Sequence, residues 1–191
     1  KQWPAQIRAA HKRASTDADR ALAEWRAHRD KLAAALCSAT GHRPEDVLGR
    51  LTLADVIPEY GLVILQDKQV DALRANRVAA TGRLWLSDLR AFLDRLIEIG
   101  RIGVRTDAGR LATSILLGES PLFSVPTPQG DVVPMTAATL RDGMPEALRC
   151  VDNFYRHRLA QKLIAHRVDP ELRHAQLGWV VSPAHLHADL S

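Results

Sequence analysis

Apolar residues recur at helical spacing along most of the chain. The clearest stripe lies in residues 15–41, where four apolar side chains share one face of a helix expected to end near Gly41: Leu22, Trp25, Leu32 and Leu36. A second stripe in 87–100 predicts a helix whose inward face carries Leu89, Phe92, Leu93, Leu96 and Ile97. The same period, with capping residues, predicts further helices in 44–51, 107–119, 135–148, 153–166, 170–178 and 182–190.

Two parts of the chain depart from this period. The segments TLADVI (52–57), GLVILQDK (61–68) and RVAATGRLWL (77–86) are rich in strand-forming residues, and the turn PEYG separates the first two. Three short strands in succession predict a small antiparallel meander. The proline-rich segment 120–134 predicts a surface loop or a pair of very short strands. The pattern indicates a single domain over residues 1–191, mainly α with a small antiparallel β-sheet, which is an α+β fold.

The composition is that of a globular protein without a membrane segment. Of the 191 residues, 46% are hydrophobic and 25% are charged, and no apolar run is long enough to span a bilayer. We therefore expect a soluble, cytoplasmic protein with no membrane partner. Cys37 and Cys150 lie far apart without ligand-like spacing, which predicts buried thiols in a reducing compartment. The net charge of +4 permits a nucleic-acid partner without requiring one.

Arg156 raises the first question of chemistry. In a helix over 153–166 it shares a face with Ala160, Leu163 and Ile164, which is the spacing of an inward stripe. A guanidinium turned toward a core or cleft is costly unless it meets an anion or several acceptors. Either an internal acid such as Asp152 satisfies it, or a ligand does.

The order of elements resembles the catalytic domain of tyrosine recombinases, the phage-integrase family. TGHRPEDVLGRLTLADV (40–56) resembles the family's first box, in which a Thr-Gly-x-Arg turn precedes a short helix and a strand. The LVILQDK hairpin, the PLF segment followed by a helix, and 153–179 with its terminal LGW resemble the family's later motifs in the same order. The resemblance runs from about residue 15 onward.

The resemblance implies roles for four residues. Arg43 and Arg156 would clamp the scissile phosphate of double-stranded DNA, and Lys68 would be the hairpin lysine that acts as general acid, with Arg74 or Arg77 as alternatives. Trp179 takes the position of the family's His or Trp. It further implies site-specific DNA recombination or integration without a cofactor, action as a homo-oligomer on DNA, and a bacterial, phage or mobile-element origin. The chain lacks an initial Met and ends abruptly, so we expect a fragment, and the resemblance implies an N-terminal DNA-binding domain that is absent from it.

The physical chemistry of these residue types agrees with such roles. Paired guanidiniums can stabilise both non-bridging oxygens of a phosphodiester in the transition state. Arg43 at the start of a helix would add its charge to an anion-attracting N-terminus, and an indole N–H at Trp179 can donate one hydrogen bond. The alternatives are that Arg43 is simply exposed and that Trp179 packs against Leu177.

Two positions depart from the family pattern. Asn153 stands where the second box has a His, and an amide cannot shuttle a proton near neutral pH. The nucleophilic tyrosine is expected at or near Ala188, and the chain's two tyrosines, Tyr60 and Tyr155, lie elsewhere. Three explanations remain open: the tyrosine was replaced by alanine, it lies beyond Ser191, or the protein binds DNA without cutting it.

Further groups of residues permit other hypotheses. His185 and His187 near Asp189 suggest a metal site, but residues two apart point to different helix faces and no third ligand is evident, so we expect none. The last third of the chain is rich in basic residues: Arg149, Arg158, Lys162, Arg167, Arg173, His157, His166 and His174. A DNA-facing groove or a merely solvated helix face explains it. A non-cleaving DNA-binding or assembly module and a helical protein-interaction domain are therefore the competing functions.

Overall fold

A computed structural model of the chain describes residues 17–66, 76–102, 106–127, 129, 131–146, 149 and 154–177. Its helices are α2 (Asp17–Thr40), α3 (Pro44–Leu48), α4 (Arg83–Ile102), α5 (Asp107–Leu116), α6 (Ala137–Gly143), α7 (Phe154–Ala165) and α8 (Pro170–Leu177). Its strands are β1 (Val56–Ile57), β2 (Leu62–Gln66), β3 (Asn76–Ala80), β4 (Ser124–Pro126) and β5 (Val132–Pro134), with a 3-10 turn, η1 (Leu53–Asp55), before β1. This mainly helical structure with small antiparallel sheets confirms the predicted α+β class.

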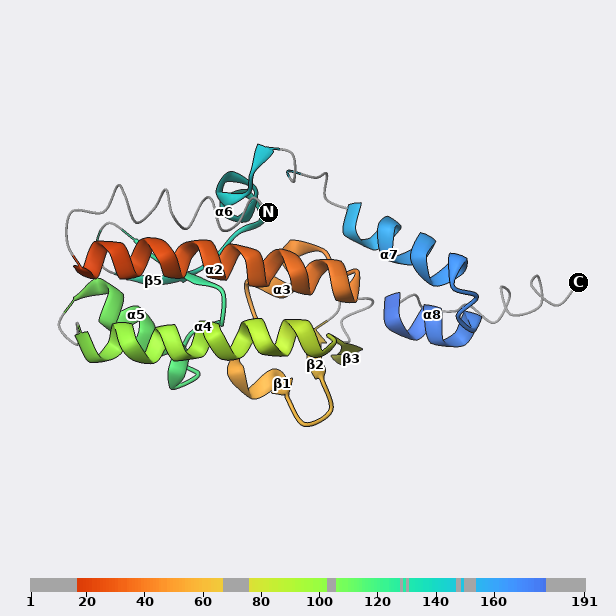
Figure 1. Ribbon diagram of the computed structural model, residues 1–191, viewed down its shortest axis with the longest axis horizontal. Coiled ribbons are helices and arrows are strands. Elements are labelled where there is room, and N and C mark those ends of the chain that lie inside the picture. The colour runs from red at the N-terminus through yellow and green to blue at the C-terminus, as the bar shows by residue number, and fades with distance from the viewer. Residues whose placement is uncertain are drawn as a thin grey trace, which may run out of the picture.

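Helix α2 forms the centre of the core, and the predicted stripe is its buried face. Trp25, Leu32 and Leu36 are at most 1% exposed, and Leu22 packs against the core from its edge. Helices α3, α4, α6 and α7 all contact α2, and α4 lies alongside it (Figure 1). Each large apolar side chain removed from water in this way stabilises the fold by about 1.5–3 kcal/mol.

The predicted meander is confirmed as a three-stranded antiparallel sheet in the order β1-β2-β3. The prediction is wrong for its first residues, because 52–55 form a turn rather than a strand. Asp55 closes this turn, since its Oδ2 accepts hydrogen bonds from the Thr52 backbone N–H at 2.8 Å and from the Thr52 hydroxyl at 2.9 Å. A short polar side chain that binds its own backbone competes with strand pairing.

Helix α4 begins at Arg83, earlier than the sequence predicted. The expected strand over 77–86 ends at Ala80, and Gly82, with a left-handed φ of +84°, interrupts the extended backbone before α4. Trp85 is then the first buried residue of the helix, and its indole N–H donates to the Leu32 carbonyl of α2 at 3.1 Å.

The inward stripe of α4 also differs at its far end. Leu89, Phe92 and Leu96 are buried as predicted, but Ile97 is 39% exposed and Ile99 is 4% exposed in its place. The buried set is spaced by three and four residues from Trp85 onward, and Ile99, not Ile97, continues that spacing.

The proline-rich segment is the predicted pair of short strands, β4 and β5, paired antiparallel. It is not a surface loop, because Leu122 and Phe123 just before β4 are fully buried. Backbone bonds tie it to the core: the Leu122 N–H donates to the Leu51 carbonyl at 2.6 Å, and the Met135 N–H donates to the Phe123 carbonyl at 2.7 Å.

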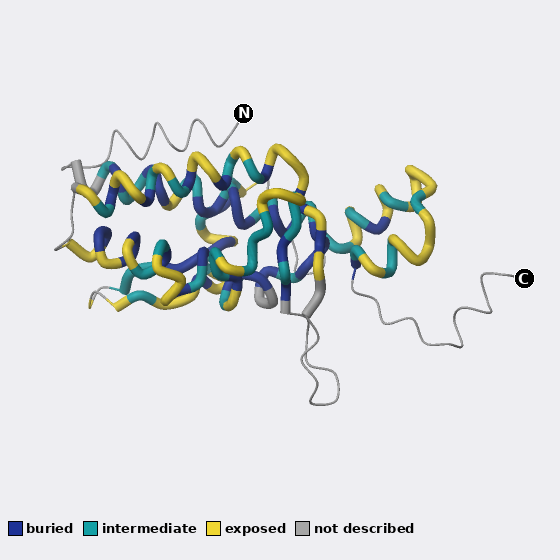
Figure 2. The backbone as a smooth tube through the Cα atoms, turned by 90° about the horizontal axis from the view of Figure 1, so that it is seen from below, coloured by how far each residue is buried: buried dark blue, intermediate teal, exposed yellow. Residues whose placement is uncertain are grey.

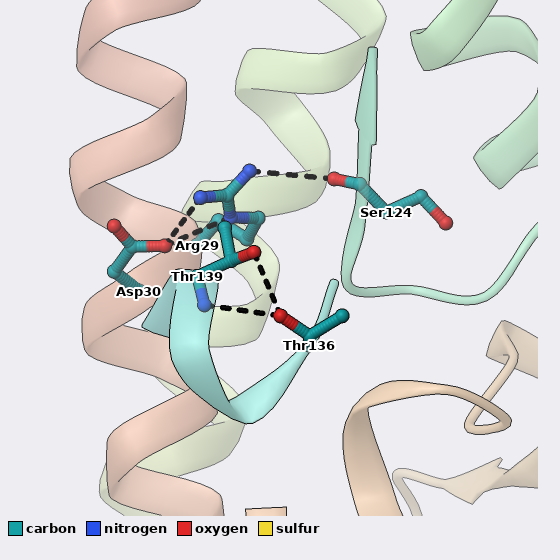
Figure 3. Close-up of polar contacts among 5 residues, drawn as sticks. All are labelled: Arg29, Asp30, Ser124, Thr136 and Thr139. Carbon is teal, nitrogen blue, oxygen red and sulfur yellow. Dashed lines mark hydrogen bonds and ion pairs between the residues drawn. The ribbon is translucent and has the colours of Figure 1, made fainter. Parts of the chain in front are cut away.

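A buried ion pair within α2 reaches β4 and lies beside α6 (Figure 3). The Arg29 Nε and Nη2 donate to Asp30 Oδ1 at 2.8 and 2.6 Å, Nη1 reaches the Ser124 carbonyl at 3.4 Å, and the guanidinium lies 5.0 Å from the Trp25 ring centroid. Burial raises the pKa of the Asp30 carboxyl although Arg29 opposes that shift, and burial lowers the pKa of Arg29. Gly143 of α6 packs so closely that a Cβ there would lie 2.9 Å from the Asp30 Cγ.

Helices α7 and α8 form a hairpin at the end of the molecule where α2 terminates (Figure 1). Helix α7 contacts α2, and α8 contacts α7 and β3. Much of the hairpin surface is exposed (Figure 2), including Ile164 at 57% and Leu172 at 64%. No helix in the described part of the chain is both long enough and apolar enough to cross a membrane.

Candidate functional site

The first predicted arginine follows a tight turn after α2. The Thr40 hydroxyl donates back to the Leu36 carbonyl at 2.8 Å, and the Gly41 N–H donates to the Cys37 carbonyl at 2.9 Å, which closes the end of the helix. Gly41 has a φ of +68°, a left-handed conformation that favours glycine. The chain then leaves through Arg43, whose backbone is extended because Pro44 follows it.

Gly41 is also the point where this turn meets α7. A Cβ at Gly41 would lie 3.6 Å from the Arg156 Cα and 3.1 Å from a methyl group of Leu159 and from one of Leu177. The Thr-Gly-x-Arg turn and the helix that carries the second predicted arginine, far apart in the sequence, are therefore in van der Waals contact.

The Arg156 side chain is half-buried at this junction. Its Nη2 donates to the backbone carbonyl of Leu177, in the last turn of α8, at 2.8 Å. Ala160 is buried on the same face as predicted, but Ile164 is exposed, so the prediction that Ile164 lies on the inward face is wrong. Asp152, the internal acid considered as an alternative partner, lies outside the described residues.

The helix N-terminus beside Arg43 attracts anions less strongly than the sequence suggested. Helix α3 does follow it, with Pro44 in its first turn, but α3 has only five residues. A helix of that length aligns few peptide dipoles, so the anion attraction at this terminus comes chiefly from the guanidinium.

The α7–α8 hairpin carries a local excess of positive charge. Residues 154–177 contain five Lys or Arg and two acids, Asp169 and Glu171. Most of its basic side chains are exposed: Arg158, Lys162, Arg167, His157 and His166, with Arg173 and His174 half-buried. Exposed Arg149 lies just before this hairpin in the sequence. The charge therefore lies on the surface, in the same hairpin as Arg156.

Several predicted residues lie outside the described part of the chain: Lys68, Arg74, Cys150, Asn153, Trp179, Ala188, His185 and His187. Among the described residues, no group of three or more His, Cys, Asp or Glu side chains is placed to hold a metal ion. Arg77 lies on β3 opposite Leu65. Cys37 is buried, as expected for a structural thiol.

The two tyrosines have different surroundings. Tyr60 is 78% exposed in the turn between β1 and β2. Tyr155 packs against the core, and its hydroxyl contacts the Met144 sulfur at 3.7 Å. The structure thus gives Tyr155 a packing role beside Arg156.

Sequence reasoning missed Gln176, whose side chain joins α8 to α2 and β3. Its amide contacts the backbone of Ala39 and Ala80 at 3.2–3.4 Å. No local pattern distinguishes this glutamine from an exposed one. Sequence reasoning also missed Arg29, although a signal was present, because Arg29 follows Trp25 by four residues on the buried stripe.

A pocket of about 660 Å³ lies elsewhere, between the β1 region and α4. Its lining is mainly apolar, with Glu59 and Arg90 as its charged members: Leu53, Val56, Pro58, Glu59, Leu86, Leu89, Arg90 and Leu93. It contains none of the predicted site residues and no cluster of groups suited to acid–base chemistry.

Comparisons with protein-family models, with characterised proteins and with solved structures found no match to this chain. Its function is therefore inferred from the contacts and charges described above.

Proposed function

We propose that this chain is a DNA-binding domain of the tyrosine recombinase type, in which Arg43 and Arg156 grip a backbone phosphate of duplex DNA. By the resemblance of its motifs it is a catalytic domain that cuts and rejoins strands through a phosphotyrosine intermediate, acts as a homo-oligomer on DNA, and has a bacterial, phage or mobile-element origin.

The contact at Gly41 carries the proposal. A phosphate clamp needs two guanidiniums that can reach the same phosphate, and Gly41 brings the turn that precedes Arg43 against the Cα of Arg156. The positive φ of Gly41 closes α2, and the same turn places Arg43 two residues after the contact with α7. The arrangement therefore favours a shared role over two independent surface charges.

The surroundings of Arg156 support a binding role. Its bond to the Leu177 carbonyl restrains the guanidinium plane. Because a guanidinium has five N–H donors, that bond is compatible with donation to a phosphate. The exposed basic residues of the hairpin would contact neighbouring phosphates without reading sequence.

The remaining roles follow from the resemblance alone. Lys68 would protonate the leaving 5′ oxygen, and Trp179 would donate a hydrogen bond to a phosphate oxygen. Asn153 can donate a hydrogen bond but cannot act as acid or base near neutral pH. The position expected for the nucleophile holds Ala188.

The grip is tested by measuring duplex affinity against salt concentration for Arg43→Ala, Arg156→Ala and the control Arg101→Ala. Arg101 is an exposed arginine in the last turn of α4, and that end of α4 lies far from α7 and α8 (Figure 1). Each clamp variant should lower the slope of log affinity against log salt by about 1, because one phosphate contact is lost. Equal behaviour of all three variants would refute the clamp.

Cleavage is tested with a nicked suicide duplex that traps covalent protein–DNA adducts. Ala188→Tyr should form an adduct if the remaining groups are competent and only the nucleophile is missing, and Arg156→Ala in that background should abolish it.

The second candidate function, a non-cleaving DNA-binding or assembly module, is favoured by Asn153 and Ala188. It predicts salt-dependent binding by the wild type and no adduct with either form. Absence of salt-dependent binding would instead leave a protein-interaction domain.

A further inference from the structure

The Gln176 side chain occupies an unusual position for a residue of a surface helix. Its Nε2 donates to the Ala39 carbonyl at 3.2 Å and to the Ala80 carbonyl at 3.4 Å, and its Oε1 accepts from the Ala80 N–H at 3.4 Å. The orientation of the amide follows from its partners, because carbonyls only accept and an N–H only donates.

Each partner is a backbone group that regular structure leaves unpaired. Ala39 lies in the last turn of α2, where carbonyls have no partner within the helix. Ala80 ends β3, which is an edge strand of the sheet. Gln176 pairs with both the N–H and the carbonyl of Ala80, as a neighbouring strand would. One side chain thus holds α8 against the end of α2 and the edge of the sheet.

This fastening lies next to the arginine of the proposed clamp. Leu177 follows Gln176, and its carbonyl accepts the bond from Arg156 Nη2 at 2.8 Å. Leu177 is also 1% exposed, and a methyl group of its side chain lies 3.1 Å from the position of a Cβ on Gly41. A shift of the last turn of α8 would therefore move the acceptor that restrains the Arg156 guanidinium.

We propose that Gln176 is a positioning residue for the phosphate clamp: its amide fixes the last turn of α8 on α2 and β3, and the Leu177 carbonyl then orients Arg156. The expected effect on DNA affinity rests on the proposed function. The orientation of Arg156 by Gln176 can be tested whether or not the protein binds DNA. Gln176 itself need not touch the nucleic acid.

The test uses Gln176→Leu, which keeps the approximate size of the side chain and removes the amide. Gln161→Leu is the matched control, because Gln161 is exposed on α7. In NMR spectra of protein with isotope-labelled arginine, the Nε–H resonance of Arg156 should shift or broaden in Gln176→Leu and stay unchanged in Gln161→Leu. An unchanged Arg156 resonance in Gln176→Leu would overturn the proposal whether or not the protein binds DNA.

The effect on DNA is measured by a double-mutant cycle in duplex affinity. Gln176→Leu should weaken binding about tenfold in the wild-type background, the effect of losing a part-buried hydrogen-bonding group. In the Arg156→Ala background it should weaken binding less than about twofold, because the residue that it positions is absent. Equal effects in both backgrounds would show a role independent of Arg156 and overturn the proposal.

Failure of the proposed function would look different. If the wild type shows no salt-dependent duplex affinity, the DNA-binding assignment falls, and the NMR comparison alone decides whether Gln176 orients Arg156. If the wild type binds and the Arg156 resonance does not respond to Gln176→Leu, the positioning role falls and the clamp remains.

Discussion

Replacing Gly41 with alanine tests the junction on which the proposed site depends. Two effects add. The residue has a φ of +68°, where an alanine costs about 1–2 kcal/mol, and the new methyl group would lie 3.1 Å from side-chain carbons of both Leu159 and Leu177. Favourable carbon–carbon contacts lie at about 3.5–4.0 Å, so both leucines must move.

The control Gly118→Ala separates these effects. Gly118 follows α5 with a φ of +74°, and a Cβ there meets no atom within 4 Å. Gly118→Ala should therefore destabilise the protein by about 1–2 kcal/mol, from backbone strain alone. Gly41→Ala adds overpacking of about 1–3 kcal/mol and should reach about 2–5 kcal/mol in total.

The assay is urea denaturation of the wild type and both variants, followed by circular dichroism, with the free energy of unfolding obtained by linear extrapolation. Gly41→Ala should also weaken duplex binding, since α7 must move away from the turn, and Gly118→Ala should leave binding unchanged. If the two variants lose the same free energy within about 0.5 kcal/mol, the hairpin does not pack on Gly41 as described, and the shared site loses its basis.

Three further predictions concern the core, the pH dependence and the hairpin turn. Asp30→Ala leaves the buried Arg29 without its carboxylate and should destabilise by about 3–5 kcal/mol in urea denaturation, whereas Arg29→Met combined with Asp30→Ala should lose less. Burial, followed by the charge of Lys31, lowers the pKa of His28 below 6.5. The neutral imidazole therefore contributes its full stability above pH 6.5, and this stability is lost as the pH falls through the folded-state pKa. His28→Gln should flatten the curve of unfolding free energy against pH in that range. Arg167 has a φ of 53°, so Arg167→Gly should raise the free energy of unfolding by about 1 kcal/mol, and lower stability of this variant in thermal melts would contradict the strain.

The helical and strand elements were largely predictable because each depends on local spacing. Trp25, Leu32 and Leu36 lie on one face only if the segment is a helix, and the antiparallel meander follows from three short strands in succession, the first two separated by a turn. The errors occur where a single residue sets a boundary. Helix α4 begins just after Gly82, where the sequence predicted a strand. Asp55 closes a turn at residues where the first strand was predicted to begin.

The candidate site was only partly predictable. Arg156 stood out because a charge on an inward helix face needs a partner, and Arg43 stood out through the motif around it. The Leu177 carbonyl as a partner of Arg156 was not predictable, because a backbone acceptor carries no sequence signature. The contacts of Gln176 could not be predicted for the same reason, since its partners are backbone groups of Ala39 and Ala80, far away in the chain.

Sequence alone thus determined the fold class and most elements, because periodicity is a local property, and it singled out Arg43 and Arg156 as candidates for the site. Tertiary structure decided that Gly41 lies against Arg156, that Gln176 fastens α8, and that Ile164 faces solvent. These depend on which helix faces meet across long sequence separations. That choice is made by packing of the whole chain and by satisfaction of backbone groups at helix and sheet ends.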